Sequence, residues 1–276
     1  MDASHEQRDH HVILAGVSKR ADLPATLRPI FAVSEALALG ATPGRLDAAD
    51  LTAPFRGMRA PRAALPDLSA LELREHELRQ LCRAYLAVAP ADARFSHVTA
   101  TRLYGMPVPE RLVSTDVSVV TARVPPRRRG IVAHRAQAGR TVMVAGLPAV
   151  PPEVAWIQLA AELTIEELIV AGDFLVRRKR PLCTMATLSD TVAQHAGRRG
   201  IRLATAALAR VRPGTDSPPE SWTRLAIVRA GFPEPVVGYE VHDNRYWVGT
   251  PDLAYPDLKI AIEYQGAGHR DTRSRS

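Results

Sequence analysis

The sequence of 276 residues predicts a mixed structure of the α+β class, in which helices and strands occupy separate stretches of the chain. Three observations support this prediction. Apolar residues recur at helical spacing over residues 66–89 and 151–210, strand-like runs occupy residues 116–150, and a helix followed by extended segments occupies residues 216–265. Hydrophobic residues make up 46% of the chain, enough for a folded protein with its own core.

The N-terminal part divides into a polar tail and a small helical unit. Residues 1–23 hold three histidines that could be imagined as metal ligands, but a disordered tail is the simpler interpretation. In residues 24–65, the apolar positions from Leu27 to Leu37 predict a helix that ends at Gly40, and Pro43 begins a second helix. Two short helices followed by an arginine-rich turn are typical of a small winged helix, a DNA-binding unit.

The central region, residues 66–212, is predicted to combine helices with a short sheet. Ser96 is placed to cap a helix that runs to Tyr104, and proline suits the first turn of another helix near residue 151. Strands are expected over residues 116–122, 130–136 and 141–150, and helices over 66–89 and within 151–210.

Two arginine-rich segments of this region each have two interpretations. Arg127, Arg128 and Arg129 form either a solvated turn or a clamp on DNA. The residues from Arg177 to Arg180 close a predicted helix, where they either interact with its negative C-terminus or contact phosphate.

Charge and cysteine content indicate the partners and the compartment. The net charge is +7, with only three lysines among the cationic residues, and a basic surface favours polyanions, although GC-rich codons explain part of the arginine excess. Cys82 and Cys183 lie in apolar helical surroundings without metal-ligand spacing, which indicates buried thiols in a reducing compartment. No apolar leader or membrane span is present, so we expect a cytoplasmic protein.

The last segment, residues 213–276, contains two carboxylates where a metal site would need them. Asp252 lies at the end of a strand predicted over residues 245–253, and Glu263 lies eleven residues on, within a strand predicted over 258–265. In an antiparallel pair this spacing brings both side chains to the same face. Glu263 interrupts an apolar string, where an unpaired buried charge would be costly and a bound cation would offset that cost. Two carboxylates with water and phosphate oxygens are typical of Mg²⁺ sites.

Two of the acidic residues also have purely structural interpretations. Glu220 follows Ser217 in an S-P-P-E helix start and is explained by capping alone. Asp252 stands beside Pro251, where aspartate commonly forms turns.

The segment from Ser217 to His269, S-P-P-E-(x11)-G-F-P-x-P followed by P-D-L-A-Y-P-D-L-K-I-A-I-E-Y-Q-G-x-G-H, resembles uncharacterised actinobacterial relatives of the very-short-patch-repair endonucleases, which belong to the PD-(D/E)xK superfamily. The resemblance covers about the last fifth of the chain. It implies metal ligands at Asp252 and Glu263, a polar active-site residue at Gln265, support of the metal or its water by Glu220, and His269 close to the scissile phosphate.

A second resemblance covers the N-terminal and central regions. The motifs P-A-T-L-R-P-I-F-(x4)-A-L-A-L-G-A-T-P-G-R-L-(x4)-L-T-A-P-F-R-G-M-R and F-S-H-V-T-A-T-R-L-Y-G-M-P are similar to AbiEi-type antitoxin proteins. This resemblance implies a degenerate winged helix that binds DNA, and a cognate toxin as a possible partner. The nuclease-like relatives continue past the G-x-G-H motif with further helices and a strand, so we expect a truncated restriction-endonuclease-like core.

Three hypotheses follow from the sequence. The first is a Mg²⁺-dependent DNA endonuclease that hydrolyses phosphodiester bonds through Asp252 and Glu263. The alternative is a non-catalytic DNA-binding transcriptional regulator of the antitoxin kind, which uses residues 24–62 and arginine contacts. The third is a truncated remnant without activity.

Overall fold

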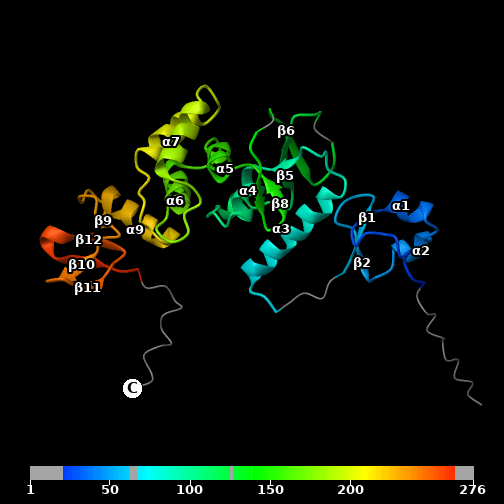
Figure 1. Cartoon of the computed structure of the whole chain (residues 1–276), viewed down its shortest axis with the longest axis horizontal. Helices are drawn as coiled ribbons and strands as arrows, with labels where there is room; N and C mark the ends of the chain where they lie inside the picture. Colours follow the sequence, from blue (N-terminus) through cyan, green and yellow to red (C-terminus); the bar gives the residue numbers. More distant parts are fainter. Residues whose placement is uncertain (1–20, 63–66, 125–126, 138, 265–276) are drawn as a thin grey trace, which may run out of the picture. The chain divides into compact units, whose positions relative to one another are not determined.

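The computed structural model describes residues 21–62, 67–124, 127–137 and 139–264, in two compact units, Met1–Ala63 and Ala64–Ser276 (Figure 1). Both units combine helices with antiparallel or mixed sheets, so the protein has the predicted α+β fold. The division between the units lies next to the boundary expected near residue 65, whereas the regions on either side of residue 213 belong to the same compact unit.

The N-terminal unit is a three-stranded antiparallel sheet with two short helices. Its core consists of Phe31, Ala36, Leu46 and Leu51, all buried. The sheet order is β1-β3-β2, and the elements are β1 (Phe31–Ala32), α1 (Val33–Ala38), α2 (Pro43–Leu46), β2 (Leu51–Thr52) and β3 (Met58–Pro61).

The first predicted helix is shorter than expected, and the second begins where it was predicted. The helix expected from Leu27 starts only at Val33. Pro29 disfavours helical geometry in the residue before it, and Phe31 and Ala32 pair with β3 as strand β1. α2 begins at Pro43, and the Thr42 hydroxyl caps it by accepting a hydrogen bond from the Arg45 amide at 3.2 Å.

A five-stranded sheet of order β6-β5-β4-β8-β7 forms one end of the second unit. β5 is parallel to β6 and β4 is parallel to β8, while the other pairs are antiparallel. The strand predicted over residues 141–150 is wrong in extent, because Ala145 and Gly146 adopt positive φ and turn the chain into a hairpin. The strands are β4 (Arg94–Phe95), β5 (Val117–Thr121), β6 (Ile131–Arg135), β7 (Val142–Val144) and β8 (Leu147–Ala149).

Two helices accompany this sheet. In α3 (Ala70–Leu86), Ser69 and Glu72 form a reciprocal capping box, and Leu78, Cys82 and Tyr85 are buried. Ser96 occupies the N-cap position of α4 (His97–Leu103) as predicted, but its side chain makes no capping hydrogen bond to the helix.

The remaining helices of the second unit are α5 (Pro152–Leu159), α6 (Ile165–Leu175), α7 (Met185–Gln194), α8 (Ile201–Leu208) and α9 (Pro218–Arg229). Of these, α5, α8 and α9 pack against α6, and α7 packs against α5 and α8. The buried Trp156 indole donates a hydrogen bond to the Leu168 carbonyl at 2.8 Å, which ties α5 to α6. A β-carbon at Gly172 would lie 2.5 Å from a Val211 methyl group, so only glycine allows this close approach.

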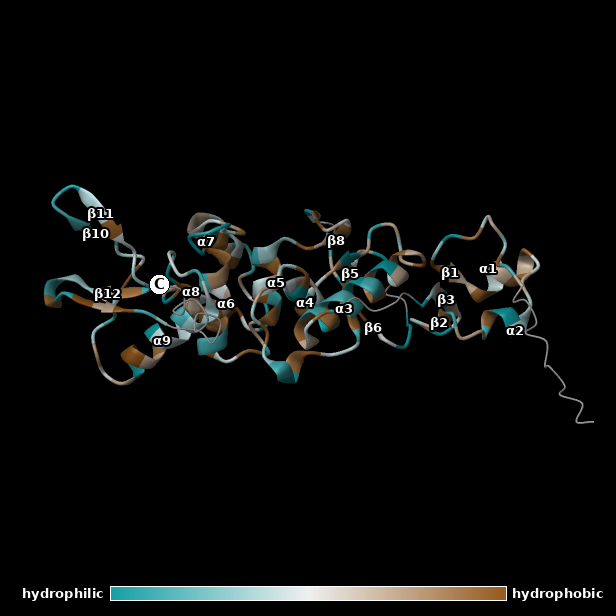
Figure 2. Cartoon of the chain, turned by 90° about the horizontal axis from the view of Figure 1, so that it is seen from below, coloured by the Kyte–Doolittle hydropathy of each residue, from teal (hydrophilic) through white to brown (hydrophobic). Residues whose placement is uncertain are grey.

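Five short strands follow α9 and form two separate sheets. β9 (Val236–Val237), β12 (Leu253–Tyr255) and β13 (Ile260–Ile262) form an antiparallel sheet of order β13-β12-β9. β10 (Val241–Asp243) and β11 (Tyr246–Gly249) form a hairpin that extends away from β12 in Figure 2.

Two expectations for this segment are wrong. The single strand expected over residues 245–253 is divided between the two sheets, with Pro251, which has no N–H to pair, between β11 and β12. The buried strand expected over residues 258–265 is the exposed edge strand β13, preceded by a 3₁₀ turn at Pro256–Leu258.

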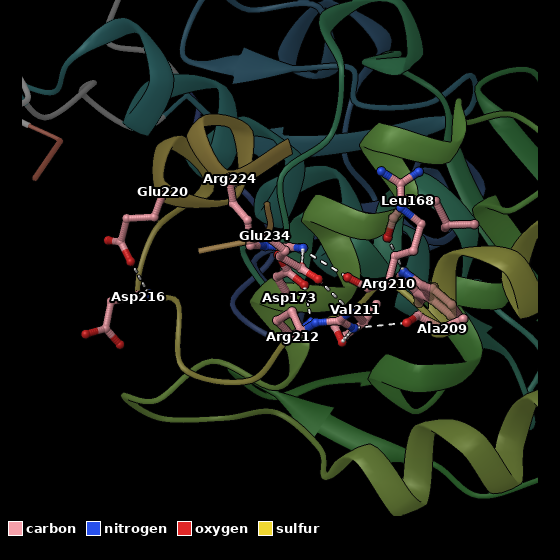
Figure 3. Close-up of polar contacts among 11 residues, drawn as sticks. Leu168, Asp173, Ala209, Arg210, Val211, Arg212, Asp216, Glu220, Arg224 and Glu234 are labelled. Atoms are coloured by element: carbon pink, nitrogen blue, oxygen red, sulfur yellow. Dashed lines mark hydrogen bonds and ion pairs between the residues drawn. The ribbon is translucent and has the colours of Figure 1, made fainter. Parts of the chain in front are cut away.

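A buried ion pair joins α9 to α6 and to the loops beside them. The Arg224 guanidinium, 1% exposed, lies 2.8 Å from the Asp173 carboxylate, 0% exposed, and 2.6 Å from Glu234 (Figure 3). Asp173 also accepts the Arg212 amide at 2.7 Å, and Arg224 donates to the Arg210 carbonyl at 3.2 Å. Burial raises the pKa of Asp173, and the positive charge of Arg224 opposes this effect.

Removing one member of this pair is expected to destabilise the fold strongly. Asp173→Asn leaves the guanidinium of Arg224 buried beside a neutral group, a change that typically lowers the free energy of unfolding by about 3–5 kcal/mol. Urea denaturation of the full chain measures this difference. Glu166→Gln is the control, since it removes the partner of the largely exposed Arg229 and should change the free energy by about 0–1 kcal/mol. Equal losses in the two variants would contradict the assignment.

Candidate functional site

Asp252 and Glu263 stand just beyond the last paired residues at one end of the β12–β13 ladder. The last paired residues of the ladder at that end are Leu253 and Ile262, so the next pair of the same register is Asp252 opposite Glu263. Residues directly opposite in an antiparallel pair project from the same face of the sheet, with β-carbons about 4.5–5.5 Å apart. The Tyr264 amide donates to Asp252 Oδ2 at 2.8 Å, so the two strands remain close at this point.

The surroundings of the two carboxylates leave oxygen atoms available. The next opposed pair on the same face is Ala254 and Ala261, whose side chains are small. Glu263 is exposed and makes no hydrogen bond or ion pair with any residue that the structure describes. Asp252 is half-buried, with one oxygen held by the Tyr264 amide. The site is therefore open to solvent and acidic, and no arginine neutralises it within the described part of the chain.

The argument that Glu263 is a buried charge is wrong. β13 forms the edge of its sheet, Ile260 in it is 46% exposed, and Glu263 itself is exposed. Water can therefore solvate this carboxylate, and no cation is required to offset a burial cost. The case for a metal site rests instead on the juxtaposition of two carboxylates.

Glu220 binds the residues just before α9, although the capping box that S-P-P-E allowed does not form, since the Ser217 side chain makes no capping hydrogen bond to the helix. Its carboxylate is 8% exposed and accepts hydrogen bonds from the Asp216 amide at 2.8 Å and from the Ser217 hydroxyl at 2.7 Å. Both oxygens of Glu220 are engaged at the start of α9 (Figure 3), so the structure accounts for this residue without a metal.

The other two residues implied by the resemblance, Gln265 and His269, lie outside the described residues. Within the described ranges, no group of three or more His, Cys, Asp or Glu side chains is arranged to hold a metal ion. The candidate site thus consists of two protein ligands, Asp252 and Glu263.

The basic segment after α6 has a role that neither interpretation anticipated. Arg178 and Lys179 form ion pairs with Asp216, at 2.5 and 3.2 Å, and the Lys179 amide also donates to Asp216 at 3.0 Å. Burial favours a higher pKa for Asp216, but the bonds from Arg178 and Lys179 outweigh it and lower the pKa. Arg177 lies over the Phe174 ring at 3.9 Å. Three of the four cations are therefore occupied within the protein.

The two cysteines are free thiols, as their surroundings predicted. Cys82 is buried and Cys183 is half-buried, and burial raises the pKa of each thiol to about 12. Neither is a reactive thiolate at neutral pH.

Comparisons with known proteins give sequence relatives but no function. No protein-family model matches the chain. The uncharacterized proteins Rv2248 and MT2308, from two strains of Mycobacterium tuberculosis, are each 29% identical over 167 residues, which are 60% of this chain and 60% of each relative. The chain thus matches less than two thirds of the length of these curated relatives. The crystal structure of RV2827C protein from Mycobacterium tuberculosis is similar with a TM-score of 0.43 and 17% identity, covering 79% of this chain and 85% of that one. Among the described residues, no helix has both the length and the apolar composition needed to cross a membrane.

The structure also reveals a histidine pair that the sequence did not single out. His97 stacks on His134 with ring centroids 4.0 Å apart and bonds the Ser96 hydroxyl through Nδ1 at 3.0 Å. Its backbone has a φ of 49°, held by an amide hydrogen bond to Gln158 at 2.8 Å. Burial, aided by the charge of His134, lowers the pKa of His97 to about 4. The positive φ of His97 cannot be read from the sequence, so no sequence signal pointed to this pair.

This pKa predicts a specific dependence of stability on pH. The unfolded chain takes up a proton on His97 near its ordinary pKa of 6.5, whereas the folded protein does so only near 4. The unfolded state therefore binds more protons between these values, and folded stability falls as the pH is lowered from 6.5 to 4. His97→Asn, which tolerates the positive φ and does not titrate, should reduce this fall in urea denaturation measured across that range.

His76→Asn is the matched control, because the His76 ring lies on α3 and bonds Gln80 rather than another histidine. If the His97→Asn protein loses as much stability as the wild type between pH 6.5 and 4, the stacked pair does not couple folding to pH.

Proposed function

We propose that the protein acts on DNA and that Asp252 and Glu263 bind a divalent cation, as in a Mg²⁺-dependent endonuclease. The observation that carries this proposal is the register that sets the two carboxylates opposite each other at the end of β12 and β13. The net charge of +7 favours a polyanionic substrate. A cytoplasmic location, where DNA is accessible, belongs to the same proposal.

The donor set fits Mg²⁺. This ion is commonly bound through one or two carboxylates and retains several waters, and the open side of the site leaves room for them. When bound, Mg²⁺ supplies an activated water and neutralises charge that develops on a phosphate.

The chain's own contribution is to orient the ligands. The Tyr264 amide donates a hydrogen bond to Oδ2 of Asp252. This bond orients the carboxylate and leaves Oδ1 free of that bond. Glu263 has no such restraint among the described residues and can adjust its side chain to the ion. One held and one adjustable carboxylate suit an ion that requires regular geometry.

A second candidate function is a DNA-binding regulator of the antitoxin kind, with a cognate toxin as a possible partner. The observation that favours it is the N-terminal unit, in which two short helices precede the β2–β3 hairpin. Several arginines of this unit are occupied internally: Arg45 pairs with Asp50 at 2.9 Å, and Arg59 pairs with Asp47 at 2.7 Å. This function does not require the two carboxylates.

Cation binding distinguishes the two functions. Isothermal titration with Mg²⁺ or Mn²⁺ should show one site in the wild-type protein. Asp252→Asn and Glu263→Gln should each weaken cation binding by at least about 10-fold, because each removes a charged donor. Changes to residues that merely support metal ligands already cost about 10–100-fold in affinity. Asp257→Asn is the matched control, with the same charge change in the exposed turn between the two strands.

Plasmid cleavage in Mg²⁺ then tests the enzymatic step. The endonuclease proposal predicts cleavage that Asp252→Asn abolishes and Asp257→Asn preserves. Wild-type protein that is as silent as Asp252→Asn would rule out hydrolysis by this chain, and cation binding that is equal in all four proteins would rule out the site.

A further inference from the structure

The strongest charge segregation in the chain lies on the five-stranded sheet. Residues 117–152 contain six arginines and no aspartate, glutamate or lysine, although both Asp116 and Glu153 flank the stretch directly. A run of 36 residues without an acidic side chain is not explained by the overall charge of the protein, because 29 acidic residues are present in the whole chain.

Three of these arginines gather along one edge of the sheet. β6 is the outer strand of the order β6-β5-β4-β8-β7 (Figure 1). Arg127 and Arg129 precede β6, Arg135 is its last residue, and all three are exposed. We call these three residues the β6 arginines. The strand itself spans about 13 Å from Ile131 to Arg135, at about 3.3 Å per residue, and Arg129 lies in the turn that precedes it.

The β6 arginines have no partner within the described part of the protein, whereas comparable arginines do. Arg140 of the same stretch pairs with Glu153 at 2.7 Å, and Arg123 lies 3.7 Å from Asp92. In the N-terminal unit, Arg62 donates to the Ala49 carbonyl at 2.8 Å. These arginines serve internal contacts, whereas the β6 arginines are available to an external anion.

We propose that the β6 arginines bind the phosphate backbone of duplex DNA. This inference rests on the proposed action on DNA and assigns a surface for it that lies apart in sequence from the candidate cation site. The strand's length of about 13 Å corresponds to about four base pairs at 3.4 Å each, so arginines before and at the end of β6 can contact more than one phosphate. Charges that only protect an exposed sheet edge from pairing can have either sign, but this edge is uniformly basic.

Salt-dependent binding tests the surface. Fluorescence anisotropy with a 30-base-pair duplex, in EDTA so that no cation site is filled, gives the slope of log affinity against log salt. The triple variant R127Q/R129Q/R135Q should bind DNA more weakly. The magnitude of its negative slope should be smaller by up to about 2.7, since each lost phosphate contact removes about 0.9.

The matched control is R74Q/R111Q/R229Q, which removes three exposed arginines that already have partners in Glu110, Glu167 and Glu166. Its charge change is the same, but its arginines are already paired, so the slope of log affinity against log salt should stay closer to that of the wild type. Circular dichroism verifies that both variants are folded.

The inference is overturned if the two triple variants lose affinity equally, which would indicate a general charge effect, or if the β6 variant binds like the wild type. It is also overturned if polyglutamate competes for the wild-type protein as well as DNA does, because the partner would then be an acidic protein. Wild-type protein that binds Mn²⁺ at Asp252 but shows no affinity for DNA would overturn this surface and leave the cation site standing.

Discussion

The buried Arg224 guanidinium holds the C-terminal part of the protein in place. It reaches Asp173 on α6 and Glu234 in the segment after α9. Arg224 and Asp173 are both buried and compensate each other's charge, while the more exposed Glu234 is a second partner of Arg224. Burial favours a higher pKa for Glu234, but the bonds from Arg212 and Arg224 outweigh it and lower the pKa. The adjoining Pro233 carbonyl accepts the Tyr255 hydroxyl of β12 at 2.6 Å. The network therefore extends from the helical core to the strand that follows Asp252.

Helices of the second unit were predictable because they bury one face. The positions that recur over residues 66–89 and 151–210 are largely those that pack in α3, α5 and α6. Strand boundaries were less predictable, because alternation over residues 141–150 does not reveal the positive φ at Ala145 that divides the run. Pro29 and Pro251 were the signals that could have corrected two of the boundaries.

The candidate site was predictable only in part. The spacing of Asp252 and Glu263 predicts opposed positions, and the ladder that ends at Leu253 and Ile262 has the register that this prediction requires. Apolar alternation could not show that β13 is an edge strand, so the burial of Glu263 was wrongly inferred. The Arg224 network was missed, although Asp173 is the one charge in the apolar run from Leu168 to Leu175 of α6, and such a residue requires a buried partner.

The central claim is that two opposed carboxylates of one small sheet bind a divalent cation. Paramagnetic broadening by Mn²⁺ of backbone amide signals tests it most directly, because the effect falls off steeply with distance from the ion. The account predicts that substoichiometric Mn²⁺ broadens the amides of residues 252–254 and 261–264 before those of the other described residues of the second unit. Broadening centred on another acidic group of the protein, or none in this sheet, would contradict it.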